Sequence, residues 1–279
     1  MKVRKLRQEE HIRTRKLWEE IFTEDTAEFL DYYYSVKTAD NEIYVIEDQG
    51  EIVSMLHLNP YQMRIENQIY PTHYIVAVAT NLQYRRRGLM AKLLHYVLQE
   101  MQDRGEPFTF LMPASEAIYK PFGFEFVYTQ GSSLVAGKNH SGIAFSLAKE
   151  EDCKDIAVFA NECLQAYDVT TWRTENYYKA ILAEQISENG GILLAKQNGQ
   201  LEGVFCFANE GQLELREPLF GEEKVLHQAV FHLTGNETEE VLCIGYGNEE
   251  SKPLIMAKVL QPEFQDILKK AKFFLNEVV

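Results

Sequence analysis

Residues 73–101 constrain the fold of this chain more than any other stretch, because three patterns follow one another there. Residues 75–79 form an uncharged run of β-branched residues and alanine, which predicts a buried strand. A basic turn, Arg85-Arg86-Arg87-Gly88, comes next. From Leu89 to Met101, apolar residues recur at helical spacing. The stretch therefore predicts a strand joined to an amphipathic helix by a basic glycine turn.

Such a turn is suited to binding phosphate. The first amides of a helix have no partners inside it, and the helix dipole makes that end positive. Arginine side chains donate forked hydrogen bonds to phosphate oxygens, and Gly88 leaves room for a close approach. The alternative is an ordinary strand-to-helix connection with solvated arginines, and these residues alone favour ligand binding over it.

The same stretch resembles motif A of the GNAT superfamily of N-acetyltransferases, a pyrophosphate loop written Arg/Gln-x-x-Gly-x-Gly/Ala. Met90 departs from that pattern, because it stands where the family has a small residue. The resemblance implies that acetyl-CoA binds here as a cosubstrate and that backbone groups of the strand pair with its pantetheine arm. A β-bulge near Val78 is then expected, because it would leave backbone groups of the strand unpaired. The implied cofactor-binding residues are Val76, Ala77, Val78, Arg85, Arg86, Arg87, Gly88, Leu89 and Met90.

A second motif follows at residues 119–124, which read Tyr-Lys-Pro-Phe-Gly-Phe. This resembles the end of GNAT motif B, Tyr-x-x-Phe-Gly-Phe, whose tyrosine lies close to the thioester sulfur in that family. Tyr119 is therefore the predicted catalytic residue. A phenol with an ordinary pKa of about 10 is protonated at neutral pH and can donate a proton to a departing thiolate. A buried structural tyrosine is the alternative.

The predicted order of elements begins again after about residue 138. A strand, two helices, a hairpin through Asn198-Gly199, a third strand at residues 213–215, a helix and a final strand follow in the order of the first half. With the wording of both motifs, this order resembles the Eis-like acetyltransferases. The resemblance implies an α/β fold of tandem GNAT-like domains, each a central mixed, mostly antiparallel sheet flanked by helices. The expected parts are a catalytic domain (1–137), a degenerate GNAT-like domain (138–252) and a C-terminal strand and helix packed on the second domain (253–279). Residues 130–133 are expected to be loop-like near the boundary, and residues 262–274 are expected to form the C-terminal helix.

The Eis-like family's third, sterol-carrier-like domain is expected to be missing or truncated in this chain. The second half has no Arg/Gln-x-x-Gly turn, and Glu222 and Glu223 stand at its helix start, where they would repel a phosphate. We therefore expect this half to bind no CoA and to form a wall of the acceptor cleft. Tyr32, Tyr33 and Tyr34 are either acceptor contacts or core residues, and the core interpretation is favoured.

Composition restricts the partners. The formal charge of −14 argues against nucleic acid and is compatible with a cationic amine acceptor or with an ordinary acidic protein. Neither a membrane-spanning run nor a signal peptide is expected. The four cysteines show no metal-binding spacing, so we predict reduced, buried thiols, no metal and a cytoplasmic location.

The predicted function is transfer of an acetyl group from acetyl-CoA to a primary amine by direct attack in a ternary complex. The base is not identified by the sequence: Glu116, Glu125, His73 and a water chain are all open. The amine is a small molecule or a peptide, and homo-oligomerisation is left open. The alternatives are a non-catalytic CoA-sensing or partner-binding module, and an unrelated enzyme whose basic turn binds a nucleotide.

Overall fold

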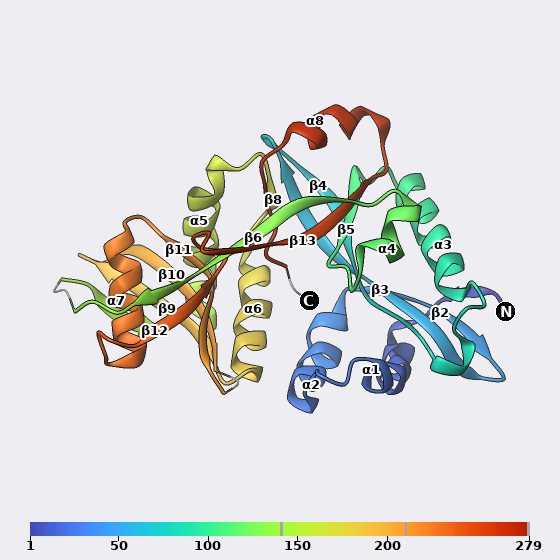
Figure 1. The fold of residues 1–279 in the computed structure, drawn as a ribbon, viewed down its shortest axis with the longest axis horizontal. Helices are drawn as coiled ribbons and strands as arrows, with labels where there is room; N and C mark the ends of the chain where they lie inside the picture. Colours follow the sequence, from blue (N-terminus) through green and yellow to red (C-terminus); the bar gives the residue numbers. More distant parts are fainter. Residues whose placement is uncertain (140–141, 210, 278–279) are drawn as a thin grey trace. The chain divides into compact units, whose positions relative to one another are not determined.

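The fold is described from a computed structural model of the chain, which covers residues 1–139, 142–209 and 211–277 (Figure 1). It divides into two compact units. The first comprises residues 1–128, 168–171 and 254–279, and the second comprises residues 129–167 and 172–253. Each unit has a mixed sheet and its own helices.

The sheet of the first unit has the strand order β1-β2-β3-β4-β5-β13. β1 to β4 form an antiparallel meander, β4 and β5 are parallel, and β13 runs antiparallel to β5. Two short strands extend it, because β8 pairs with β3 and β14 pairs with β8. The bounds are β1 Val3–Lys5, β2 Glu42–Asp48, β3 Glu51–Ile65, β4 Gln68–Thr80, β5 Phe108–Leu111, β8 Val169–Thr171, β13 Glu250–Val259 and β14 Phe273–Phe274.

Helices cover both faces of this sheet. α3 (Leu89–Asp103) packs an apolar stripe that includes Leu93 and Val97, both fully buried. α1 (Arg15–Ile21) and α2 (Ala27–Ser35) pack on the opposite face. The His57 ring of β3 contacts aromatic rings of both helices. The preceding residue, Leu56, points to the other face, because it pairs with Tyr44, whose ring contacts α3. The first unit also contains the short helices α4 Glu116–Tyr119 and α8 Gln265–Lys270, and several 3-10 helices, of which the longest is η1 Gln8–Thr14.

The second unit has the strand order β6-β12-β11-β10-β9-β7, with β6 entering it at Thr129. Its core lies between the sheet and α7, around Phe205, Leu226 and Val230. The bounds are β6 Glu125–Ala136, β7 Ala144–Leu147, α5 Cys153–Cys163, α6 Glu175–Ser187, β9 Gly191–Gln197, β10 Gln200–Asn209, β11 Leu213–Phe220, α7 Glu223–Thr234 and β12 Glu240–Ile244.

The expected mixed α/β fold with sheets flanked by helices is confirmed, but two local predictions were wrong. Residues 130–133 look loop-like because they contain glycine and serine, yet they continue β6. A side chain at Gly131 would meet the carbonyl oxygen of Gly247 at 2.1 Å, so the small residue permits a close backbone approach within the sheet. The predicted helix at residues 262–274 is shorter, because Phe273 and Phe274 form β14.

The C-terminal segment also differs from expectation. Residues 254–279 cluster with the first unit and not with the second, because residues 256–259 of β13 pair with β5. The predicted domain limits, and the independent folding of each domain, stay a prediction. None of the helices in the part of the chain that the structure describes is long and apolar enough to cross a membrane.

The cysteines are all free thiols. Cys153, Cys206 and Cys243 are buried, as predicted, whereas Cys163 is only partly buried. Burial raises the pKa of the Cys163 thiol to about 11. Among residues 1–139, 142–209 and 211–277, no cluster of three or more His, Cys, Asp or Glu side chains is arranged to hold a metal ion.

Candidate functional site

β4 and β5 separate soon after they meet. Their ladder in the described chain consists of the pair Tyr74 and Phe110. One residue earlier in each strand, the Thr109 hydroxyl donates to the His73 carbonyl oxygen at 2.7 Å, which holds the two strands together before they separate. Further along, β5 ends at Leu111 while β4 continues to Thr80. The strands thus leave a stretch of β4 beside which another extended chain can lie.

A β-bulge lies in this part of β4. Met55 and His57 of β3 are two residues apart, but their partners Ala79 and Val76 are three apart, so the extra residue is on β4. Ala77 has a φ of 52°, which is uncommon for a residue with a side chain. The bulge expected near Val78 is therefore confirmed. It takes the backbone of Ala77 and Val78 out of the regular ladder with β3.

The basic turn connects this strand to α3. Gly88 is the N-cap of α3 with a φ of 73°, and Arg86 also has a positive φ, 62°. A side chain added at Gly88 would meet no other atom within 4 Å. Glycine is thus required by the backbone conformation and not by crowding, and open space adjoins the first amides of the helix.

The three arginines of the turn are all exposed, but they differ in what holds them. Arg85 Nε donates to the Thr80 carbonyl oxygen at 3.3 Å. Arg87 donates to the Gln83 carbonyl oxygen at 3.0 Å and lies 4.7 Å from the centre of the Tyr84 ring. These two contacts restrain the Arg87 side chain. Of the next two predicted residues, Leu89 is buried and Met90 is partly buried.

Tyr119 ends the short helix α4 and is 6% exposed. Its ring meets Phe124 edge-on, with 6.0 Å between centroids, and Gly123 makes the turn between them with a φ of 85°. Burial raises the pKa of the Tyr119 phenol to about 12. Tyr119 is therefore neutral and able to donate a proton throughout the physiological pH range.

Tyr74 marks the point where β4 and β5 part, and it was not singled out by the sequence analysis. Its ring stacks on Phe110 at 5.0 Å and approaches Tyr61 at 6.3 Å. Lys37 donates to the Tyr61 hydroxyl at 2.9 Å. No motif marks Tyr74; the only available signal was an aromatic residue next to the β-branched run of the central strand.

Tyr32 and Tyr33 of α2 are buried in the core, as favoured, and Tyr34 is partly buried. Tyr33 is fully buried, and its hydroxyl contacts His57 Nδ1 at 3.0 Å and donates to Asn59 Oδ1 at 3.2 Å. Burial, together with the neighbouring His11, lowers the pKa of His57 to about 3. His57 is thus a neutral core residue at neutral pH.

The three bases considered from the sequence have different surroundings. His73 Nδ1 lies 2.9 Å from Glu106 Oε1. Glu116 pairs with Lys120 at 2.9 Å on the exposed side of α4. Glu125 is exposed at the start of β6. No hydrogen bond between Tyr119 and any of these three residues occurs in the described structure.

The second unit contains a matching bulge. Val204 and Cys206 of β10 are two residues apart, but their partners on β11, Leu219 and Arg216, are three apart. Glu217 has a φ of 50° at this point. Aligning the two bulges places Glu217 at the position of Ala77. It also places Pro218, which has no backbone N–H, at the position of Val78.

In the second unit, the neighbouring strand stays paired up to the bulge. β11 and β12 pair over three residues, from Glu214 with Leu242 to Arg216 with Ile244. In the bulge alignment, the first of these pairs corresponds to Tyr74 and Phe110, so the ladder continues where β4 and β5 separate. The Glu217 side chain accepts from the fully buried Arg173 at 2.8 Å. α7 then begins with Glu222 as N-cap and Glu223 in its first turn.

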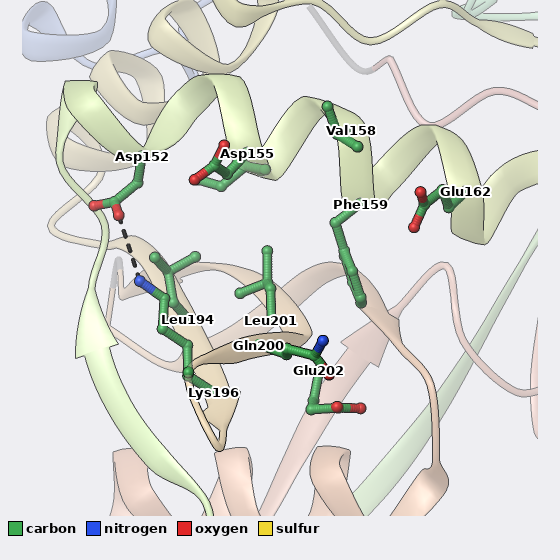
Figure 2. Close-up of a pocket in the computed structure, with 12 residues that line it drawn as sticks. Asp152, Asp155, Val158, Phe159, Glu162, Leu194, Lys196, Gln200, Leu201 and Glu202 are labelled. Atoms are coloured by element: carbon green, nitrogen blue, oxygen red, sulfur yellow. Dashed lines mark ion pairs between the residues drawn. The ribbon is translucent and has the colours of Figure 1, made fainter.

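Two cavities lie elsewhere. One, of about 510 Å³, lies in the second unit between α5 and the β9–β10 hairpin, and Figure 2 shows Asp155, Phe159 and Glu162 projecting from α5 toward it. Its acidic lining includes Asp152, which pairs with Lys196 at 3.6 Å. The other, of about 450 Å³, lies between α1, the β2–β3 hairpin and the segment before the basic turn. Neither cavity is lined by Tyr119 or by the bulge of β4.

The first part of the chain matches a known family model. Residues 2–127 match the family model of the acetyltransferase (GNAT) domain. This range contains β4, the basic turn, α3 and Tyr119. No protein with a curated description matches the chain in sequence.

Solved structures share the fold over most of the chain at low sequence identity. A conserved protein from Enterococcus faecalis V583, described as a probable N-acyltransferase, has a TM-score of 0.79 at 18% identity, over 93% of this chain and 72% of its own. Eis1 from Mycobacterium abscessus has a TM-score of 0.69 at 12% identity, over 93% and 74%. N-myristoyltransferase from Saccharomyces cerevisiae, solved with bound myristoyl-CoA, has a TM-score of 0.61 at 9% identity, over 92% and 78%. The fold is thus one that N-acyltransferases share.

Proposed function

We propose that this chain is an N-acetyltransferase of the Eis-like type, which transfers the acetyl group of acetyl-CoA to a primary amine by direct attack in a ternary complex. The observation that carries the proposal is the arrangement around β4. This strand separates from β5 after Tyr74, bulges at Ala77, and leads through the Arg85–Gly88 turn into α3. One strand thus offers an extended edge and then a helix start with three cationic side chains.

The residues fit the two ends of acetyl-CoA. The pyrophosphate would bind at the open start of α3, on the amides that follow Gly88 and on Arg85 and Arg86. Arg87 would contribute its charge from its position on Tyr84. The pantetheine arm would pair with the backbone of Val76, Ala77 and Val78, and Leu89 and Met90 would form the floor of the helix start.

The chemistry requires a stabilised oxyanion and a proton for the leaving thiolate. A backbone amide released by the bulge, near Val78, would donate to the thioester oxygen as negative charge develops on it. The neutral phenol of Tyr119 would donate its proton to the departing sulfur. The amine forms its bond to the carbonyl carbon as the carbon–sulfur bond breaks, and the proton that the nitrogen loses passes to a base or to a water chain.

We further propose that the second unit is a degenerate GNAT-like domain that binds no CoA. Three observations support this proposal. β11 and β12 stay paired up to Arg216, directly before the bulge, Pro218 stands at the position of Val78, and Arg173 forms an ion pair with Glu217. The acceptor is proposed to be a cationic amine, because the chain is strongly acidic, with a formal charge of −14.

The decisive experiment is a thiol-release assay with acetyl-CoA across an aminoglycoside, a polyamine, a lysine peptide and a small metabolite amine. We expect release that depends on at least one amine, with a matching acetylated product by mass. Binding of acetyl-CoA without release for any amine would favour the non-catalytic CoA-sensing module instead. A thermal-shift response to nucleotides but not to acetyl-CoA would favour an unrelated nucleotide site.

A further inference from the structure

Tyr74 closes the separated stretch of β4 at the end away from the basic turn. It pairs with Phe110 in the ladder between β4 and β5. The two rings stack on each other, with 5.0 Å between their centroids and 27° between their planes, and both side chains are buried. The strands are therefore joined at this end, and aromatic rings fill one face of the junction.

Neighbouring rings hold the Tyr74 ring in place. Tyr61 meets Tyr74 edge-on at 6.3 Å and approaches Phe110 at 6.0 Å. Lys37 fixes Tyr61 in turn, because it donates to the Tyr61 hydroxyl at 2.9 Å and its ammonium lies 4.8 Å from the centre of that ring. Phe108 approaches Phe110 at 5.9 Å. Displacing the Tyr74 ring would therefore require several close-packed side chains to move.

The Tyr74 side chain extends from the junction along the two strands. Burial and then Tyr61 raise the pKa of its phenol, and a hydrogen bond from the Met112 backbone opposes that rise. Met112 follows directly after β5 and is two residues beyond Phe110, the ladder partner of Tyr74. Counted along the parallel strands from that pair, the Tyr74 hydroxyl is level with Val76, about 7 Å nearer the turn.

The proposed binding mode directs the acyl group toward this ring. The pyrophosphate lies at the turn after β4 and the thioester oxygen near Val78, so the acyl chain continues along β4 toward Tyr74. From Val78 to the level of Val76 the strand offers at most about 7 Å before the Tyr74 side chain begins. An acetyl group fits within this length, whereas the extended alkyl chain of an octanoyl group is longer than it.

We propose that the ring of Tyr74 limits the acyl group to short chains, an inference that rests on the proposed acetyl transfer. The reaction is the same for every chain length: the amine nitrogen bonds to the carbonyl carbon, the carbon–sulfur bond breaks, and the proton lost by nitrogen ends on sulfur. The products are an amide and free CoA thiol. A long chain must displace the ring or bend away from β4, so the discrimination falls on kcat/KM.

The test measures kcat/KM for thiol release from acetyl-CoA and from octanoyl-CoA, with the best amine of the panel. We expect the wild type to prefer acetyl-CoA at least about 100-fold. Tyr74→Val removes the ring and should reduce this preference at least about tenfold, by raising kcat/KM for octanoyl-CoA. Tyr74→Phe keeps the ring and should keep the preference. The matched control is Tyr44→Val, which removes an equally buried tyrosine of β2 that lies against α3, and it should also keep the preference.

The ratio of the two kcat/KM values separates selection by the ring from a structural role, because a loosened fold lowers both values together. A wild type that uses octanoyl-CoA as well as acetyl-CoA would overturn the inference while leaving the transferase activity in place. An unchanged ratio in Tyr74→Val, or the same shift in Tyr44→Val, would also overturn it. If Tyr74→Val does not fold, Phe110→Leu removes the other stacked ring, and an unchanged ratio there would overturn the inference. A wild type that releases thiol from neither acyl-CoA would instead refute the transfer itself.

Discussion

Ala77 in β4 and Glu217 in β11 have almost the same backbone conformation, with φ values of 52° and 50°. Each lies at a bulge that places two residues of its strand opposite one residue of the preceding strand. The two units thus keep the same local device but surround it differently. In the first unit, β5 parts from β4 after Tyr74, three residues before Ala77. In the second unit, β12 stays paired with β11 as far as Arg216, directly before Glu217, and a buried arginine neutralises the Glu217 side chain.

This difference predicts one acetyl-CoA per chain. A second molecule would need a separated strand pair before the second bulge and a backbone amide at it. Instead, β11 and β12 stay paired up to Arg216, and Pro218 has no N–H. Isothermal titration of the wild type should give a stoichiometry close to one, and titration of Arg86→Glu should show that single transition weakened. A remaining second transition in the variant would refute the assignment of the second unit.

Tyr119→Phe should separate chemistry from binding. The substitution removes only the hydroxyl, so kcat should fall about 100-fold while the affinity for acetyl-CoA changes less than about twofold. Because burial raises the pKa of Tyr119 to about 12, the donor form persists as the pH rises past the ordinary value and is lost only near pH 12. The wild-type kcat should therefore show no loss from this group between about pH 8 and pH 10.

The matched control for this substitution is Tyr96→Phe, on the exposed side of α3, where the ring is 44% exposed. It should leave kcat and the pH profile unchanged. Equal rates for Tyr119→Phe and the wild type would remove Tyr119 from the reaction and leave it as a buried structural residue.

Arg86→Glu should weaken binding of acetyl-CoA through charge. Arg86 is an exposed residue of the turn before α3, so reversing its charge adds repulsion toward a pyrophosphate. We expect the Kd to rise at least about tenfold at low salt and the difference to shrink at high salt, because exposed charges are screened. Lys154→Glu on α5 makes the same change of net charge in the second unit and should leave the Kd unchanged. A similar effect of both substitutions would indicate general electrostatics instead of a local site.

Much of the site could be predicted from sequence because its determinants are local. The β-branched run, the glycine turn and the helical stripe of residues 89–101 each act over a few neighbours, and the structure places β4, the turn and α3 there. The bulge near Val78 was also predictable, although only from the resemblance, since neither Ala77 nor Val78 is a residue type that marks positive φ.

The rest depends on contacts between residues far apart in the chain. β8 is three residues long, and its pairing with β3 joins Thr171 to Met63, so no local pattern could reveal it. The attachment of the C-terminal segment to the first unit likewise depends on β13 pairing with β5.

Gly88→Ala tests whether the space at the helix start is used by a ligand. Gly88 and Gly105 flank α3, have φ values of 73° and 77°, and would each place a new Cβ with no atom within 4 Å. Either substitution should therefore cost about 1 kcal/mol of stability from left-handed strain, seen as a similar fall in Tm. Only Gly88→Ala should weaken acetyl-CoA binding, because only there would the new methyl group meet the pyrophosphate. Equal Kd values for the two variants would mean that the cofactor does not approach the start of α3.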